Sequence, residues 1–329
     1  MRYFLYRRTT PFYTVSREDL INTTRAILAK AGFEISSALN LRSICFDIVG
    51  RKDETLLIIK VLSNVDAFSR ENAEDMKVLA DALRATPLLV GETSSSGSLE
   101  AGIVYSRFKI PIISNETLGE HLLEEVPPFI FAAPGGLYMK IDGELLRKIR
   151  EADGISLGTL AEITGVSRRT IQMYESGMGA MIDAAMRLEE FLKIPIIEPI
   201  NPFEYSSNKK PEDYEVKGGE HTDSNTLNRL LEIGFAITPV TKSPFEAISR
   251  SRQTVFLTGL GIDEEKLIQK AIIASEISKI AGKHSLIIVE RERSAENIES
   301  TAVVTSEELN KIDDQDALTD LALSRSTKK

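Results

Sequence analysis

The alternation of apolar and polar positions over the first 125 residues is typical of an α/β domain. Apolar side chains return at helical spacing after Ser16, a candidate helix N-cap, and two later apolar runs flank the turn-forming residues 50–54. We predict helices over residues 17–31 and 73–83, and strands over residues 44–49, 55–62, 86–91 and 111–114. The pattern therefore predicts one α/β domain over residues 1–125.

A similar order of apolar runs returns near the end of the chain. Residues 46–49 and 55–58 match residues 245–248 and 254–257 without a gap, and a helical stretch and a buried strand follow in both places. We interpret residues 226–312 as a second α/β domain and as a diverged copy of the first. The alternative is a chance match, because α/β domains share a common layout.

Proline, glycine and polar residues mark the boundaries between the predicted domains. Residues 126–139 and 199–225 are rich in these residue types and predict two linkers around a central all-α domain over residues 140–198. Residues 313–329 are polar and predict a frayed or marginally helical tail. The chain is thus expected to be a multidomain protein.

The most specific motif of the sequence lies at residues 160–177, LAEITGVSRRTIQMYESG. Ala161 is small where two helices must approach each other, and Gly165 permits the left-handed backbone of a sharp turn. Ser167 can cap the next helix, and Gly177 can end it. The positions spaced to bury one face of both helices are Leu160, Val166, Ile171 and Tyr174. This pattern predicts a helix-turn-helix.

The second helix of this motif carries groups that recognise base edges. Arg168, Arg169, Gln172 and Met173 fall at or near its outer face. Arginine donates two hydrogen bonds to guanine, glutamine pairs with adenine, and a helix N-terminus attracts phosphate.

These residues resemble the Cro/repressor (XRE) family of helix-turn-helix domains over residues 142–195, with flanking helices over residues 143–151 and 181–192. The resemblance implies a recognition helix over residues 167–176 in the major groove, with base contacts from Arg168, Arg169 and Met173. The DNA-binding residues that we predict are Ser167, Arg168, Arg169, Thr170, Gln172 and Met173. The resemblance also implies a structural salt bridge between Arg150 and Glu175. The chain departs from the family at Leu157, where a glutamine commonly contacts phosphate.

Nearly the full chain resembles archaeal HTH-type transcriptional regulatory proteins, with a Cro-like domain between two α/β segments. The resemblance implies a sequence-specific transcription regulator whose partner is double-stranded DNA. One recognition helix covers only a half-site, so we expect a homodimer. A small-molecule effector of unknown identity is a further possible partner.

The first domain also resembles restriction-endonuclease-like folds. Such enzymes hold Mg²⁺ with a strand aspartate and with an acid two residues before a lysine. Asp47 and Lys60 match two of these positions, but Ile58 occupies the third and cannot bind a hard cation. In the second copy Glu246 aligns with Asp47, whereas Leu257 and Gly259 replace the acid and the lysine. We therefore expect a non-enzymatic scaffold; a metal-dependent DNA-cleaving protein is the alternative, and a protein-interaction scaffold that has lost DNA binding is a third.

Composition limits the remaining classes of function. The net charge is -9, and the basic and acidic residues number 15 and 17 before residue 126, 8 and 10 from there to residue 200, and 17 and 22 after it. DNA binding must therefore rely on a small local surface. The only cysteine, Cys45, excludes an intramolecular disulfide and is expected to be buried. Three histidines without metal-ligand spacing indicate neither a metal nor a cofactor, and the lack of a signal peptide or membrane span predicts a cytoplasmic protein.

Overall fold

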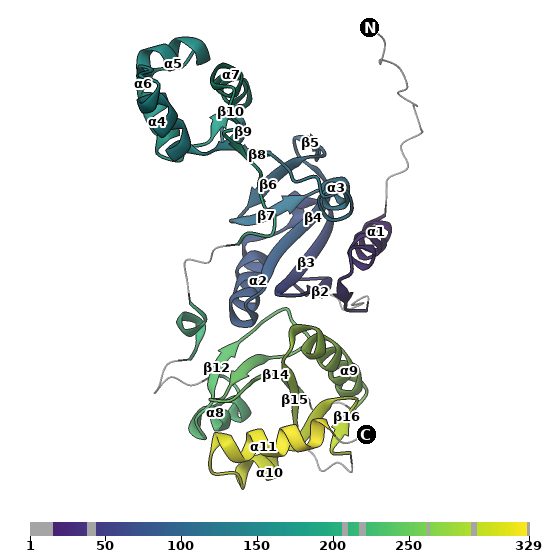
Figure 1. Ribbon diagram of the computed structural model, residues 1–329. Helices are drawn as coiled ribbons and strands as arrows, with labels where there is room; N and C mark the ends of the chain where they lie inside the picture. Colours follow the sequence, from purple (N-terminus) through teal and green to yellow (C-terminus); the bar gives the residue numbers. More distant parts are fainter. Residues whose placement is uncertain are drawn as a thin grey trace.

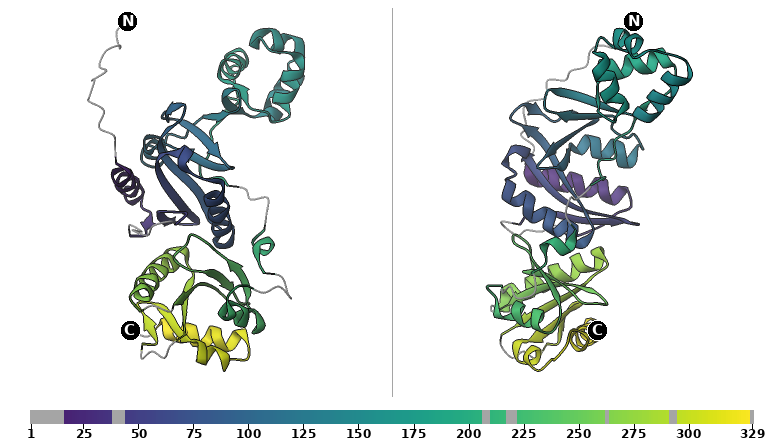
Figure 2. Two further views of the ribbon diagram at one scale, coloured as in Figure 1. Left: turned by 180° about the vertical axis from the view of Figure 1, so that it is seen from behind. Right: turned by 90° about the vertical axis from the view of Figure 1, so that its left-hand side faces the viewer.

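The computed structural model describes residues 16–37, 44–205, 210–216, 222–261, 264–290 and 295–327, and these form three domains in a row (Figures 1 and 2). The N-terminal α/β domain lies in the middle of the row, between the helix-turn-helix domain and the C-terminal α/β domain. The first residues of the chain, where a signal peptide would lie, and parts of the second predicted linker fall outside the described residues. No helix in the described residues is long and apolar enough to cross a membrane.

The N-terminal domain is a mixed sheet with helices on both faces (Figure 1). Its helices are α1 (Arg17–Lys30), η1 (Val65–Ala67), α2 (Arg70–Leu83) and α3 (Asn115–Leu123). Its strands are β1 (Glu34–Ile35), β2 (Ile48–Lys52), β3 (Thr55–Asn64), β4 (Thr86–Ser94), β5 (Gly97–Ser98), β6 (Ile103–Arg107) and β7 (Ile110–Ile113). The main strand order is β1-β2-β3-β4-β7-β6. Leu20, Leu28 and Leu118 from α1 and α3 pack on one face, and Met76 and Leu79 from α2 pack on the other.

The C-terminal domain has the same topology. Its strands are β12 (Ala236–Pro239), β13 (Ala247–Arg250), β14 (Val255–Gly261), β15 (His284–Val289), β16 (Asn297–Ile298) and β17 (Thr301–Thr305). Its helices are α8 (Asn225–Glu232), α9 (Glu264–Ala281), α10 (Ser306–Asn310) and α11 (Gln315–Ser326). The order β12-β13-β14-β15-β17-β16 repeats that of the first sheet, and each pair of neighbours has the same parallel or antiparallel sense as its counterpart. This shared topology supports the predicted duplication.

The expectation of a frayed or marginally helical tail is wrong. Asp314 caps α11, and Leu318 and Ala322 of this helix are fully buried against the C-terminal sheet. The buried face also includes Thr319 and Arg325, whose polar side chains predict exposed positions when the sequence alone is considered. A helix whose buried side carries polar groups has little amphipathic signal.

The predicted linker over residues 126–139 is instead largely a β-hairpin, formed by β8 (Ile130–Ala133) and β9 (Gly136–Ile141). Strand β8 pairs in parallel with β6, so the hairpin extends the N-terminal sheet. Pro134 and Gly135 form the two-residue loop between the strands, and Gly135 has a φ of 99°. Proline and glycine are typical of a tight turn as well as of a linker, which is why the composition was ambiguous.

The central domain is not purely helical, because β9 also pairs with β10 (Ala180–Met181) and β11 (Ile197–Glu198). Its helices are α4 (Gly143–Ala152), α5 (Leu157–Thr164), α6 (Arg168–Glu175) and α7 (Ile182–Leu192). The hydrogen-bonded strands join this domain directly to the N-terminal sheet. Its position is therefore fixed by backbone hydrogen bonds and not by a flexible connection.

The described parts of the second predicted linker lie along the N-terminal domain. The backbone N–H of Ile200 donates to the carbonyl of Pro128 over 2.7 Å, and the hydroxyl of Thr86 donates to the carbonyl of Phe203 over 3.0 Å. Farther along the chain, the short helix η2 (Pro211–Tyr214) ends at Tyr214, whose hydroxyl donates to Asp81 over 2.9 Å. The described parts of this connection therefore pack against the N-terminal domain on the way from the helix-turn-helix domain to the C-terminal domain.

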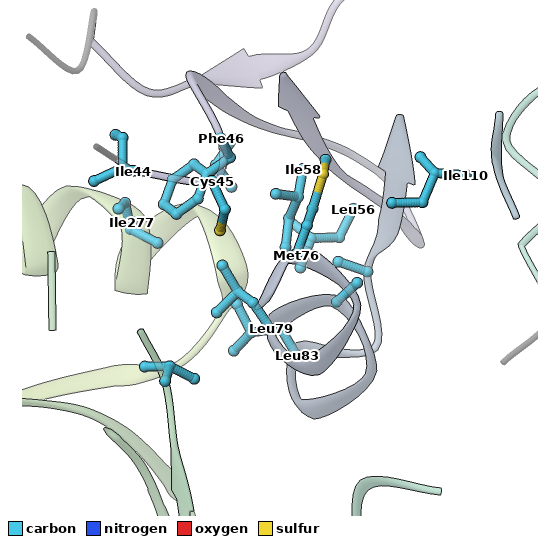
Figure 3. Packing of buried hydrophobic residues seen from close by; sticks show 14 of the residues in the cluster. Ile44, Cys45, Phe46, Leu56, Ile58, Met76, Leu79, Leu83, Ile110 and Ile277 are labelled. Atoms are coloured by element: carbon cyan, nitrogen blue, oxygen red, sulfur yellow. The ribbon is translucent and has the colours of Figure 1, made fainter. Parts of the chain in front are cut away.

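The two α/β domains share one apolar core (Figure 3). Cys45 and Phe46 of the first domain pack with Ile277 of α9 and with Phe245, all of them buried. The backbone N–H of Cys45 donates to the carbonyl of Lys242 over 2.8 Å. The helices at this interface, α2 and α9, occupy equivalent places in the two copies, and the expected burial of Cys45 is confirmed.

Candidate nucleic-acid interface

The helix-turn-helix is built from α5 and α6, which are joined by a turn of three residues. Gly165 has the left-handed φ of 73° that its position predicts, and the N–H of Val166 donates to the carbonyl of Ala161 over 3.1 Å. Ser167 caps α6 by accepting from the N–H of Thr170 over 3.0 Å. At the other end Gly177 has a φ of 92° and donates to the carbonyl of Tyr174 over 3.0 Å. Both ends of α6 are therefore fixed by the residues that the motif singles out.

A compact apolar core holds the two helices against each other. Leu160 and Ile171 are fully buried, Tyr174 nearly so, and Val166 is partly buried against the same cluster. Burial, with a smaller contribution from Tyr138, raises the pKa of the Tyr174 phenol, although its oxygen accepts a hydrogen bond from the backbone of Met181 that opposes this shift. Helix α7 closes this core with Ala184, Ala185 and Leu188.

The outer face of α6 is polar and open to solvent. Arg168, Arg169 and Gln172 are exposed, and Met173 keeps 45% of its surface accessible although it is apolar. Thr170 is half-buried, and its hydroxyl is hydrogen-bonded to that of Ser167 at 2.9 Å. The structure thus brings four of the six predicted DNA-binding side chains to one open face and places Ser167 and Thr170 at the cap of the helix.

Two contacts around α6 could not be predicted from the motif. A β-carbon at Gly158 of α5 would lie 3.1 Å from Nη2 of Arg168, so this guanidinium rests over the first turn of α5. A β-carbon at Gly165 would lie 3.8 Å from Nη1 of Arg187, an exposed residue of α7. Arg187 therefore adds a positive charge beside the turn of the motif. It lies on a separate helix, so only the folded chain brings it there.

Arg150 and Glu175 form an ion pair behind the recognition helix. Nε of Arg150 donates to Oε1 of Glu175, and Nη2 donates to Oε2 over 3.2 Å. Both side chains are largely buried, and the hydrogen bond to Glu175 raises the pKa of Arg150. This pair connects α4 to the end of α6 and leaves no free carboxylate at Glu175 to repel DNA.

Leu157 begins α5 directly after its N-cap, Ser156, and packs against the core of the domain. An apolar side chain there cannot donate a hydrogen bond to phosphate. The cations available at this side of the motif are Arg168 and Arg187.

In the first domain, the aspartate that matches a metal ligand of the nucleases forms ion pairs instead. Asp47 is buried, and its Oδ1 accepts from Arg17 over 2.6 Å and from Lys60 over 3.2 Å. Its Oδ2 accepts from the N–H of Val61 over 2.8 Å, and Ile58 is fully buried. The structure brings Asp47 and Lys60 together as the fold predicts, but without a second carboxylate. Among the described residues no group of three or more acids, histidines or cysteines could hold a metal ion. A single ion-paired carboxylate beside the apolar Ile58 does not fit Mg²⁺.

Comparison with known proteins gives two domain matches. Residues 17–128 match a PD-(D/E)XK superfamily domain, and residues 146–198 match a helix-turn-helix domain. No solved structure matches the chain.

Relatives similar over nearly their whole length come from several archaea. The chain is 41% identical to a protein of Methanocella arvoryzae, with 96% of this chain and 98% of that protein covered. It is 37% identical to a protein of Methanosarcina barkeri, with 92% and 96% covered, and 35% identical to one of Halobacterium salinarum, with 94% and 98% covered. Each is named "Putative HTH-type transcriptional regulatory protein". The chain belongs to this family.

Family membership and the domain matches agree with the architecture of the chain. This family member combines a PD-(D/E)XK α/β domain, a helix-turn-helix domain of the XRE type and a C-terminal domain with a mixed sheet. The predicted fold class and the predicted resemblance are confirmed.

Proposed function

We propose that this family member regulates transcription by placing α6 in the major groove of a specific DNA site. The observation that supports this most strongly is the open face of Arg168, Arg169, Gln172 and Met173 on a helix that is capped at both ends. A helix held in this way needs no further ordering of its backbone when it binds. Arg168 and Arg169 supply positive charge at this surface, although the chain as a whole is acidic.

The contacts suggest a division of roles. Arg169 and Gln172 point away from the buried residues Ile171 and Tyr174, and we assign them to base edges, with Met173 beside a thymine methyl group. Arg168, which rests over Gly158, and Arg187 lie at the sides of α6 and are assigned to phosphates. Ser167 and Thr170 position the first turn of the helix through their mutual hydrogen bond.

The proposal includes a homodimer on DNA, because one recognition helix reads only a half-site. Besides Met173, four large apolar side chains of the central domain are exposed, which is compatible with a contact to a second copy. They are Met181, Met186, Phe191 and Ile194. Sedimentation with a labelled duplex is expected to give two chains for each DNA molecule, and one chain at saturation would contradict the dimer.

We further propose that the PD-(D/E)XK domain acts without cleaving DNA, because both oxygens of Asp47 are engaged by Arg17, Lys60 and Val61. Incubation with plasmid DNA and Mg²⁺ or Mn²⁺ is expected to leave supercoiled DNA intact. Nicking by the wild type that disappears in both Asp47→Ala and Lys60→Ala would instead establish the nuclease alternative.

The main experiment is selection of binding sites from a pool of random duplex DNA. The wild type is expected to enrich one motif with two-fold symmetry, and the Arg168→Ala/Arg169→Ala double variant is expected to lose it. Arg147→Ala is the matched control, because Arg147 is an exposed arginine on α4, and not on α6, that pairs with Glu151. Failure of the wild type to enrich any site, even at low salt, would contradict the proposal and favour a protein-interaction scaffold.

A further inference from the structure

The C-terminal domain contains a cavity of about 580 Å³ at the end of its sheet, which we call the α8–α9 cavity. It is bordered by the start of α8, the end of β14, one side of α9 and the end of β15. Its volume lies within the range of about 300–1,000 Å³ that is typical of small-molecule sites. None of the roles proposed above for the helix-turn-helix uses it.

The duplication explains why the cavity exists in the second copy. Asp47 and Glu246 occupy equivalent positions, since their N–H groups donate to Ile59 and Thr258 over 2.7 and 3.0 Å. One oxygen of each acid accepts from the following strand, from the N–H of Val61 over 2.8 Å or of Leu260 over 2.7 Å.

The side chains around these two acids differ in size. In the first domain the long cations Arg17 and Lys60 extend to Asp47 and fill the space beside it. In the second domain Gly259 stands in the place of Lys60. Helix α8 has 8 residues where α1 has 14, and it begins at Asn225 without the first turns that carry Arg17 in the first domain. The two long cations beside Asp47 therefore have no counterpart in the described residues beside Glu246.

The charges that line the cavity are unbalanced. Lys270 from α9 is paired with Glu246, so these two neutralise each other. Asp223 and Glu290 are exposed at the cavity, and no hydrogen bond or ion pair joins either side chain to another described residue. Among the described residues, the site therefore keeps two carboxylates that form no ion pair, since Lys270 is engaged by Glu246.

Part of the remaining wall is apolar and consists of Leu260, Leu267 and Ile288, while Ser224, Asn225 and Thr226 line the side at the start of α8. The carboxylates do not gather into a metal site, because the described residues contain no group of three ligands within reach of one ion. Two separate carboxylates beside an aliphatic wall match a ligand with two separate ammonium groups on a hydrocarbon chain.

We infer that the α8–α9 cavity binds an aliphatic diamine or polyamine. Its ammonium groups pair with Asp223 and Glu290, and its methylene chain lies along Leu260, Leu267 and Ile288. This site makes the C-terminal domain a ligand-binding module, and its occupancy is independent of whether α6 binds DNA.

Calorimetric titration of the full chain with 1,4-diaminobutane and with spermidine, in the absence of DNA, tests this inference. We expect saturable binding of one ligand for each chain, and at least a tenfold weaker affinity in Glu290→Gln and in Asp223→Asn. Glu92→Gln is the matched control, because Glu92 lies in β4 at the position equivalent to that of Glu290 after β15, and it does not line the α8–α9 cavity. Its affinity is expected to equal that of the wild type.

A second variant fills the cavity without removing an acid. Asn225→Arg places a long cation on a residue that lines the cavity, at an exposed helix position, so the fold is expected to survive. This variant is expected to lose diamine binding while its thermal unfolding stays unchanged. The inference is overturned if the wild type binds neither amine, if it binds MgCl₂ or succinate in preference to the amines, or if Glu290→Gln and Asp223→Asn bind as the wild type does.

Discussion

Cys45 shows at the residue scale how the interface between the two α/β domains changes the chemistry of one side chain. The thiol is fully buried between Phe46 and the C-terminal domain. This burial, with a smaller contribution from the charge of Asp75, raises its pKa from 9.0 to about 12. The thiolate is the nucleophilic form, so Cys45 is unreactive while the interface is closed.

This state of Cys45 leads to a prediction. At pH 8 an aromatic disulfide reagent is expected not to modify the native protein and to modify one thiol for each chain after unfolding in guanidinium chloride. The appearance of the thiolate leaving group, followed by absorbance, measures both. Rapid modification of the native protein would show that the interdomain core is open in solution.

Gly143 is a second residue whose environment sets a strict limit. It begins α4, and a β-carbon there would lie 2.4 Å from the carbonyl oxygen of Tyr174 at the end of α6. The backbone of α4 therefore touches the recognition helix directly, and Gly143→Ala would push the two helices apart.

We expect Gly143→Ala to destabilise the protein by about 1–3 kcal/mol, the usual cost of overpacking, measured by urea unfolding. Gly119→Ala in α3 is the control, because its β-carbon would meet only Ile27, at an ordinary 3.8 Å. Its stability is expected to stay the same or to rise, since alanine is the better helix former. Equal effects of the two substitutions would show that α4 does not press on α6.

At the scale of elements, local signals located most of the helix-turn-helix. Ser156 and Ser167 cap α5 and α6, and Gly165 forms the turn, each as its residue type predicts. These features depend on neighbours within four residues in the sequence, so they can be read without the fold. Helix α1 and strands β3 and β4 likewise begin at residues that the apolar pattern predicted.

Elements that depend on distant partners could not be read in this way. Strand β8 is stabilised by pairing with β6, and its turn at Pro134 and Gly135 resembles a linker in composition. Helix α11 buries Arg325, whose guanidinium pairs with Glu308 of α10 and donates to the carbonyl of Val303 over 2.6 Å. A buried arginine that needs a partner from another helix is invisible to a hydrophobic pattern.

The ion pair between α10 and α11 predicts a pH dependence of stability. Hydrogen bonds from Arg325, followed by those at the N-cap of α10, lower the pKa of Glu308 from 4.5 to about 2. Because the folded-state pKa is the lower one, the stabilisation is complete above pH 4.5 and is lost as the pH falls towards 2. Arg325→Met is therefore expected to remove part of the acid dependence of the free energy of unfolding in this window.

Chemical unfolding at several pH values from 6 to 2.5 measures this effect. Lys311→Met is the control, because it breaks the exposed pair of Lys311 with Glu307 on the same helix. Exposed pairs contribute little, so its pH dependence is expected to follow the wild type. If Arg325→Met followed the wild type as well, the pair would not stabilise α11.

At the scale of the whole molecule, the duplication determines how the domains are used. Two copies of one topology pack through equivalent helices, α2 and α9, and the central domain is attached to the first copy by β8 and β9. The ion-paired site around Asp47 and the cavity around Glu246 are two outcomes of the same ancestral position. The sequence allowed this alignment, but the cavity depends on how α8, β14, α9 and β15 come together in the fold.

The candidate DNA surface shows the same limit. Its central residues, Arg169 and Gln172, were predictable because they belong to one helix with a strong motif. Arg187 and the contact of Arg168 with Gly158 were not, because they join three different helices. The charges at the sides of α6 are therefore a property of the folded domain.

The most direct test of the central proposal compares affinities for the selected duplex and for a set of duplexes that each carry one altered base pair. Arg169→Ala is expected to weaken binding to the selected site by about 1–3 kcal/mol. This variant is also expected to lose the preference for one base pair at one position of each half-site. Arg187→Ala, the phosphate-contact control, is expected to weaken binding to every duplex alike. An Arg169→Ala variant that keeps the full base preference of the wild type would contradict the assignment of α6 as the helix that reads the DNA sequence.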